Sequence, residues 1–184
     1  DAINAEEQLL DFEQTPFLIL MNMLNQVEPF DLLWHTVLEF HQSYEKWYYG
    51  PFKNLDAEEI KESVENMWRI LYKLAKTLFD VPGSKRIAEM VRAKVEKFKQ
   101  FLPVLQTICN PGIQERHWNQ ISEAVGITIL PTPESTLSDM IDLGLTKHIT
   151  KLEEIGVTAS REFSLEQSLR KMKQEWIDIC FELI

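Results

Sequence analysis

Glycine is scarce in this sequence, and its glycines are widely separated. The six glycines are Gly50, Gly83, Gly112, Gly126, Gly144 and Gly156. Neither a GxxxxGK[ST] nor a GxGxxG motif can form from glycines so far apart, and such loops hold phosphate through closely spaced backbone N–H groups. A glycine-rich nucleotide site is therefore excluded, and we expect no cofactor in this segment.

Long apolar runs and paired cysteines are also missing. No window holds eighteen uninterrupted apolar residues, and no basic stretch precedes a short apolar one. We therefore expect a soluble, intracellular protein that does not enter a membrane. Cys109 and Cys180 lie in apolar helical patterns rather than a CxxC pair, which predicts buried free thiols. Because the chain starts at Asp1 without methionine and ends in an apolar run, we interpret it as an excerpt.

Positive charge is in deficit, but the deficit is uneven. The formal net charge is −10. Residues 1–68 carry fourteen acids and three bases (net −11), residues 69–117 ten bases and four acids (net +6), and residues 118–184 a net −5. An acidic chain is poorly suited to bind nucleic acid, because basic side chains must displace the counterions of the phosphates. The basic middle third could instead meet an acidic protein partner.

Helical periodicity dominates the remaining pattern. From Ile60, the apolar residues Val64, Met67, Leu71, Leu74 and Leu78 follow at steps of four and three, as on the buried face of a helix. The fold class predicted is all-α. Consecutive antiparallel helical bundles should form an elongated rod, with sub-bundles at roughly 1–110 and 111–184.

Caps and breakers place the expected helices. We predict one helix at about 56–81 and a second that starts after Ser84 and is kinked at Pro103. Two shorter helices are expected at 112–126 and at 137–143, the latter closed by Gly144. Two more should follow at 146–161 and from Ser164 onward. The last should bury the stripe Leu165, Leu169, Met172, Trp176 and Ile179. Upstream, Pro16 should open a helix, and Pro29 should separate it from another that ends at Gly50. Residues 130–133 form a stiff connector, and the sequence favours a strand at 181–184 alone.

Acid and base side chains do not assemble into a recognisable catalytic set. Asp31, His35 and Glu39 share one helix face and could hold a metal, but a solvated face is favoured because HExxH spacing is missing. His41 and Glu45 are interpreted in the same way. A Cys109–His117 pair is disfavoured because Cys109 ends an apolar stripe. We predict no catalytic, cofactor-binding or metal-binding residue.

Two clusters remain as candidate sites. Trp47, Tyr48, Tyr49 and Phe52 lie at a helix end and either pack under the following loop, the favoured alternative, or form an interface for a partner. The triplet Arg116, His117 and Trp118 opens a short helix after the turn at 110–112. We predict a structural role for it, with Trp118 as a buried anchor and Arg116 free to pair with a carboxylate.

Several of these motifs, taken in order, resemble the N-terminal linker region of dynein heavy chains, of an axonemal inner-arm type. They are Tyr49-Gly50-Pro51-Phe52, Met67-Trp68-Arg69, Leu102-Pro103-Val104-Leu105, Asn110-Pro111-Gly112, Arg116-His117-Trp118, Leu143-Gly144-Leu145, Glu162-Phe163-Ser164-Leu165-Glu166 and Met172-Lys173-Gln174-Glu175-Trp176. The resemblance covers nearly the whole chain. It makes the triplet a signature of the family.

The resemblance implies a mechanical role without catalysis in this segment. In such motors the linker is a helical rod that arches over the AAA+ ring, joins it to the tail, and switches between bent and straight positions. The resemblance places ATP and Mg²⁺ elsewhere in a longer chain, and microtubule binding in a distant domain. Its implied partners are the AAA+ ring, the tail and the chains associated with the tail. Its implied location is the cytoplasm and cytoskeleton, in the axoneme of a cilium or flagellum.

Two other functions stay open on the residues alone. One is a helical scaffold that binds a partner through the basic middle third or the aromatic cluster. The other is an enzyme that uses Asp31, His35 and Glu39.

Overall fold

The computed structural model describes residues 2–13 and 15–177, and the regular elements in these ranges are all helices. The all-α prediction is therefore confirmed. One isolated bridge pairs Pro51 with Thr136. The strand considered at 181–184 lies outside the described residues.

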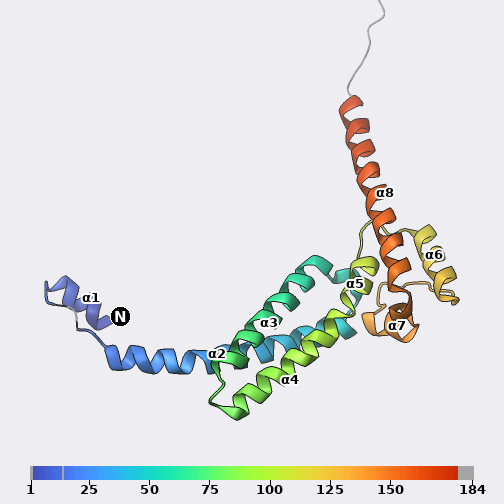
Figure 1. The fold of residues 1–184 in the computed structure, drawn as a ribbon. Coiled ribbons are helices and arrows are strands. Elements are labelled where there is room, and N and C mark those ends of the chain that lie inside the picture. The colour runs from blue at the N-terminus through green and yellow to red at the C-terminus, as the bar shows by residue number, and fades with distance from the viewer. Residues whose placement is uncertain (1, 14, 178–184) are drawn as a thin grey trace, which may run out of the picture.

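The chain begins with two helices, of which the first and the N-terminal half of the second extend away from the rest (Figure 1). They are α1 (Ala2–Leu9) and the long α2 (Leu18–Tyr49). Pro29 lies inside α2, so the prediction that it separates two helices was wrong. Proline removes only one helical N–H donor, and the residues around it keep the helix continuous. Helix α2 ends just before Gly50, as predicted.

The second half of α2 packs with α3 (Ala57–Thr77) and α4 (Pro82–Lys99) into a three-helix bundle. Asp56 caps α3, because its Oδ1 accepts the N–H groups of Glu58 and Glu59 at 2.9 and 3.2 Å. The predicted stripe of α3 is buried from Ile60 to Leu74. It belongs to one buried core together with Leu33 and Phe40 of α2 and Val95 of α4.

Helix α4 stops earlier than predicted. It ends at Lys99, and a new helix, α5 (Leu102–Ile108), follows after Phe101. Pro103 therefore lies in the first turn of α5 and does not kink the preceding helix. A proline is tolerated in a first turn because the N–H it lacks has no helical acceptor there.

Three short elements follow α5: α6 (Glu115–Val125), α7 (Leu137–Asp142) and the 3₁₀ helix η2 (Leu145–His148). A further 3₁₀ helix, η1 (Phe52–Asn54), lies earlier in the chain, between α2 and α3. Gly126 and Gly144 close α6 and α7 with φ of 80° and 88°, the left-handed conformation that glycine adopts without strain. Both helix ends agree with the sequence prediction.

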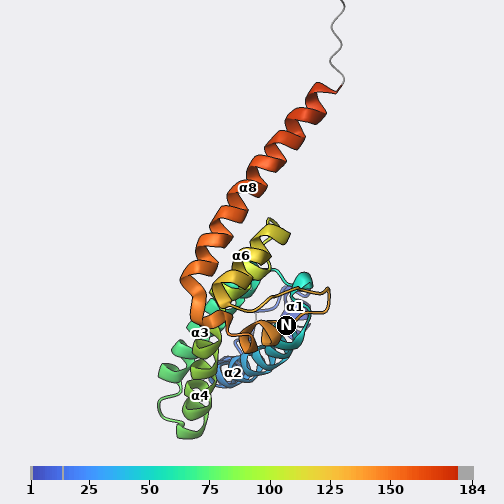
Figure 2. The ribbon, with the colours of Figure 1, turned by 90° about the vertical axis from the view of Figure 1, so that its right-hand side faces the viewer.

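The last helix, α8 (Ile149–Trp176), is continuous. The predicted break between 161 and Ser164 was wrong, because no glycine or proline lies there to end the helix. Its first half packs on α5 and α6, whereas its second half projects from the body (Figures 1 and 2). Leu165, Leu169, Met172 and Trp176 were predicted to be buried, yet they are 56–66% exposed. Ile179 lies outside the described residues.

The described chain is elongated, with α1 and the first half of α2 projecting from one side and α8 from another (Figure 1). Between them lies the body formed by the bundle and the short helices. Helix α5 packs against both α3 and α8, so it connects the bundle to the projecting helix. The division at about residue 110 stays a prediction.

Candidate functional site

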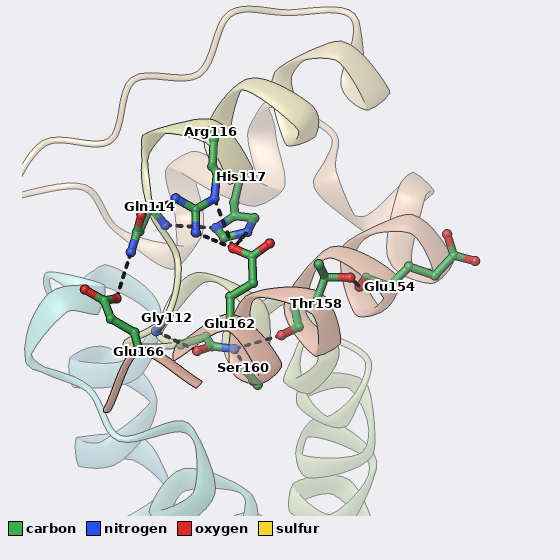
Figure 3. Close-up of polar contacts among 11 residues, drawn as sticks. Gly112, Gln114, Arg116, His117, Glu154, Thr158, Ser160, Glu162 and Glu166 are labelled. Carbon is green, nitrogen blue, oxygen red and sulfur yellow. Dashed lines mark hydrogen bonds and ion pairs between the residues drawn. The ribbon is translucent and has the colours of Figure 1, made fainter. Parts of the chain in front are cut away.

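The triplet Arg116-His117-Trp118 lies where the start of α6 meets the middle of α8. Figure 3 shows the side chains of α6 facing those of α8, with the turn before α6 beside them. We call this contact the α6–α8 junction and define it by eight residues. They are Asn110, Gly112, Gln114, Arg116 and His117 on one side, and Ser160, Glu162 and Glu166 on α8.

The turn before α6 is tied to the backbone of α8. The Asn110 amide nitrogen donates to the Gly156 carbonyl at 3.1 Å and to the Ser160 hydroxyl at 2.7 Å. Its oxygen accepts the N–H of Gly112 at 2.8 Å, which fixes the turn. A Cβ on Gly112 would lie 2.4 Å from the Ala159 carbonyl oxygen. Only glycine lets the turn approach α8 this closely.

His117 holds the first turn of α6 and reaches α8 at the same time. It is 1% exposed, and its Nδ1 accepts the backbone N–H of Gln114 at 3.1 Å, as in a capping box. Its Nε2 lies 3.3 Å from Glu162. Since Nδ1 acts as an acceptor, the ring proton is assigned to Nε2, which donates to Glu162. The buried imidazole therefore has a partner on each nitrogen.

Arg116 binds the same carboxylate from the solvent side. Its Nε donates to Glu162 at 3.0 Å, its Nη2 donates to the same oxygen, and its Nη1 donates to the side chain of Gln114. Gln114 in turn donates to Glu166 at 3.4 Å. The carboxylate that the sequence could not identify for Arg116 is therefore Glu162, 46 residues downstream.

The electrostatics of the junction favour an ionised Glu162. Hydrogen bonds from the Arg116 guanidinium lower the pKa of this carboxyl, and the charge of Arg116 and the contact with His117 act in the same direction. Partial desolvation opposes them without reversing the shift. Because Arg116 and Glu162 are about half exposed, solvent weakens this ion pair, and its main effect is to fix orientation.

Trp118 points away from the polar junction and into the core. It is 9% exposed, and its ring centroid lies 6.2 Å from that of Phe52. The structure therefore agrees with the predicted anchor role. Within the aromatic cluster, Trp47 and Phe52 are buried, Tyr48 is half-buried and Tyr49 is 57% exposed. Two of the four proposed interface rings thus pack internally, and an interface role for the others stays a prediction.

A second contact, between α5 and α8, reinforces the junction. The Thr107 hydroxyl donates to the Pro103 carbonyl at 3.0 Å and to the Leu152 carbonyl of α8 at 3.2 Å. Gly156 lies opposite Thr107, and a Cβ there would be 3.4 Å from the Thr107 hydroxyl. This contact between Thr107 and α8 was not predicted from the sequence. Its signal was a glycine in a helical pattern, which often marks close helix packing.

Comparison with known proteins agrees with the resemblance seen in the sequence. Residues 20–184 match the family described as "Dynein heavy chain, N-terminal region 2". This chain belongs to the dynein heavy chain family. It is 47% identical over its whole length to dynein axonemal heavy chain 3 of Mus musculus and of Homo sapiens. It is 32% identical, over 98% of its length, to dynein axonemal heavy chain 12 of Homo sapiens.

The chain spans only 4% of the length of the first two relatives and 6% of the third. The junction is therefore one element of what in those dynein heavy chains is a far longer polypeptide. It contains an amide, a guanidinium, an imidazole and carboxylates that are hydrogen-bonded to one another. Such an arrangement can fix the angle between two helices.

The surroundings of Cys109, the thiol considered for catalysis in this dynein segment, disfavour its ionised form. Burial raises the pKa of Cys109 to about 12, and the charge of Asp56 acts in the same direction. Its Sγ donates to the Phe52 carbonyl at 3.4 Å, while His117 is bonded to Gln114 and Glu162. The disfavoured Cys109–His117 pair is therefore not assembled. Cys180 lies outside the described residues.

The acid and base residues that the sequence singled out on α2 lie outside the α6–α8 junction. Asp31, His35 and Glu39 are exposed, and His35 Nδ1 lies 3.3 Å from Asp31. Among residues 2–13 and 15–177, no three His, Cys, Asp or Glu side chains are placed to hold a metal ion. In the same ranges, no helix has the length and apolar character needed to cross a membrane.

Proposed function

We propose that residues 1–184 form part of the linker of an axonemal dynein motor and transmit force without catalysing a reaction. The observation that carries the proposal is the family match over residues 20–184. The fold supports it, because α8 is one continuous helix that is held at its base by two contacts and projects beyond them. A stiff helix with a fixed base is suited to carry a displacement.

The rest of the proposal concerns the longer protein. ATP and Mg²⁺ would bind elsewhere in the heavy chain, and the linker would move as the AAA+ ring of the same chain changes conformation. The tail and its associated chains would lie at the other end of the linker, and a distant domain would contact the microtubule. The similarity to dynein axonemal heavy chain 3 supports an axonemal location in a cilium or flagellum.

The contacts indicate the route that a force would take through this segment. Helix α8 is bonded directly to α5 through Thr107, and to the turn before α6 through Asn110. The loop at 127–136 between α6 and α7, which contains the predicted connector at 130–133, lies outside these contacts. A displacement of α8 would therefore reach the three-helix bundle through α5, and also through η2 and α7, because η2 packs on α8 and α7 packs on α2. Neither route passes along the connector.

The test uses a full-length heavy chain with flexible Gly/Ser insertions. An insertion between Ser168 and Leu169 would interrupt the projecting part of α8, beyond the junction. We expect microtubule gliding to slow severely while a substantial ATPase rate persists, because the ring still turns over but its displacement is absorbed by the flexible stretch. The matched control is the same insertion at Thr132 in the connector, where loops tolerate added residues. We expect it to leave gliding nearly unchanged.

Equal gliding velocities for the α8 insertion and the wild-type motor, with helical content retained, would contradict the proposal. Severe slowing by the connector insertion alone would instead place the load path through residues 127–136.

A scaffold that binds partner proteins is the second candidate. The exposed apolar residues favour it. More than half of each side chain is exposed at four residues of α2 and four of α8: Leu18, Ile19, Met21, Leu24, Leu165, Leu169, Met172 and Trp176. Exposed apolar surface of this extent usually belongs to a contact with another protein segment. Unchanged gliding with the α8 insertion would favour this scaffold role.

A further inference from the structure

A hollow of about 470 Å³ lies between α2 and α4, on the three-helix bundle. Helices α2 and α4 pack on each other there. Phe40, Tyr44 and Tyr48 of α2, Lys94 and Lys97 of α4, and Phe101 line it, and most of its exposed lining is apolar. We call it the α2–α4 groove. It contains no residue of the α6–α8 junction.

Aromatic rings form the apolar wall of the groove. Tyr44 and Tyr48 are stacked, with centroids 5.1 Å apart and planes 10° from parallel. Tyr44 also meets the edge of Phe98 at 5.7 Å, and Tyr48 lies 6.0 Å from Phe101. Stacked rings that are held by their neighbours present a rigid surface, so little side-chain entropy is lost when a ligand packs against them.

Two lysines form the opposite, charged rim. Lys94 and Lys97 are exposed, and neither ammonium lies within 4.0 Å of a carboxylate in the part of the chain that the structure describes. Glu45 also lines the groove, but its carboxylate is farther from them. Within α4, six bases stand against two acids, although the whole chain carries −10. The groove therefore has a locally basic rim on an acidic protein.

We propose that the α2–α4 groove binds an acidic segment of another polypeptide, with its carboxylates on Lys94 and Lys97 and an apolar side chain against Tyr44 and Tyr48. The two rims fit such a segment because apolar anchors supply binding energy and charge complementarity supplies orientation. A protein segment fits better than nucleic acid, because the net charge of −10 repels an extended polyanion and the wall is apolar.

The tyrosine hydroxyls suit an acidic partner as well. Burial raises the pKa of Tyr44, and the neighbouring Tyr48 and Tyr49 act in the same direction. A phenol is protonated at neutral pH in any case, so this hydroxyl has a proton that it can donate to a carboxylate.

The test measures fluorescence anisotropy of a labelled peptide made of Glu-Glu-Leu-Phe repeats, added to the full-length heavy chain. We expect binding that weakens with added salt, as ion pairs are screened. Lys94→Glu/Lys97→Glu should weaken it about tenfold or more, because two attractions become repulsions. The matched control is Lys85→Glu/Arg86→Glu, which makes the same change of charge in the first turns of α4, outside the groove. It should leave the affinity nearly unchanged.

Four further results decide whether the groove binds an acidic segment. Weaker binding of Gln-Gln-Leu-Phe and Glu-Glu-Ser-Ser repeats would support the need for both charge and an apolar anchor. An absence of binding at about 1 mM peptide, or equal losses in the two charge-reversal variants, would overturn the proposal. Displacement of the peptide by a homopolymeric RNA at equal affinity would also overturn it, in favour of an unspecific polyanion surface. None of these results depends on gliding or ATPase rates, so the groove can fail while the proposed linker function stands.

Discussion

Gly112 lies directly against Ala159 of α8, so that a Cβ added to the glycine would be 2.4 Å from the Ala159 carbonyl oxygen and 2.8 Å from Cβ of Phe163. Backbone and Cβ atoms cannot turn aside as the end of a long side chain can. The tightest point of the α6–α8 junction is therefore a contact between main chains.

Gly112→Ala should destabilise the chain by about 1 to 3 kcal/mol, because α8 must shift to accommodate the methyl group. Urea unfolding followed by circular dichroism measures this change. Gly83→Ala is the matched control, since nothing lies within 4 Å of a Cβ there, and it should be neutral or stabilising by up to about 1 kcal/mol. Equal stability of the Gly112→Ala variant and the wild type would contradict the close contact.

Trp118→Ala should cost about 3 to 5 kcal/mol of unfolding free energy, as expected for removal of a large buried ring. His117→Ala should cost less, because Arg116 continues to bind Glu162. Trp176→Ala, at a tryptophan that is 63% exposed, is the control and should change stability by less than about 0.5 kcal/mol. An unchanged melting temperature for Trp118→Ala would assign this tryptophan to the surface.

Replacement of Glu162 should make the stability of the chain less dependent on acid pH. The pKa of Glu162 is lowered in the folded protein, so its contribution is complete above the ordinary carboxyl pKa of about 4 and is lost as the pH falls through the lower folded value. Glu162→Gln should therefore be less stable than wild type at pH 7, and the difference should shrink towards pH 3.

The control for this series is Glu154→Gln, which replaces an exposed glutamate of the same helix that lies away from the junction (Figure 3). Its stability should follow that of the wild type across the pH range. A difference between Glu162→Gln and wild type that stays constant from pH 7 to pH 3 would contradict the charge-assisted contact.

Cys109 should react slowly with thiol reagents in the folded protein. With a pKa of about 12, only about one thiol in ten thousand is ionised at pH 8. In a Cys180→Ser background, we expect iodoacetamide to label Cys109 no faster than the chain unfolds, and labelling to accelerate strongly in urea. Rapid labelling without denaturant would show that the Cys109 environment opens in the native state.

The helix ends were the most predictable part of the fold. Asp56, Gly126 and Gly144 act through the neighbouring residues, so their capping roles could be inferred locally. Pro29 was misjudged because a breaker and a tolerated interior proline look alike in sequence. The stripe of α8 was identified as apolar, but periodicity cannot tell whether a partner is present within the described chain.

The junction was predictable only in part. The buried role of Trp118 follows from its position on an apolar face. The pairing of Arg116 with Glu162 joins residues 46 positions apart, and several exposed glutamates were equally possible from sequence. The close approaches at Gly112 and Gly156 had a local signal, since glycine at both positions permits backbone contact. Nothing in the sequence indicated that Gly112 meets α8 or that Gly156 meets α5.

The small residues that line α8 have a consequence for sliding. Thr107 fits over Gly156, and an axial shift of α8 by about 1.5 Å, the rise of one residue, would move Gly156 out from under it and strain its bond to the Leu152 carbonyl. The next small side chains, Ala159 and Ser160, lie three and four residues further along. An axial shift of about a full helical turn, roughly 5.4 Å, would bring Ala159 or Ser160 to this position, so the packing of α8 on α5 favours whole-turn steps over one-residue steps under axial load.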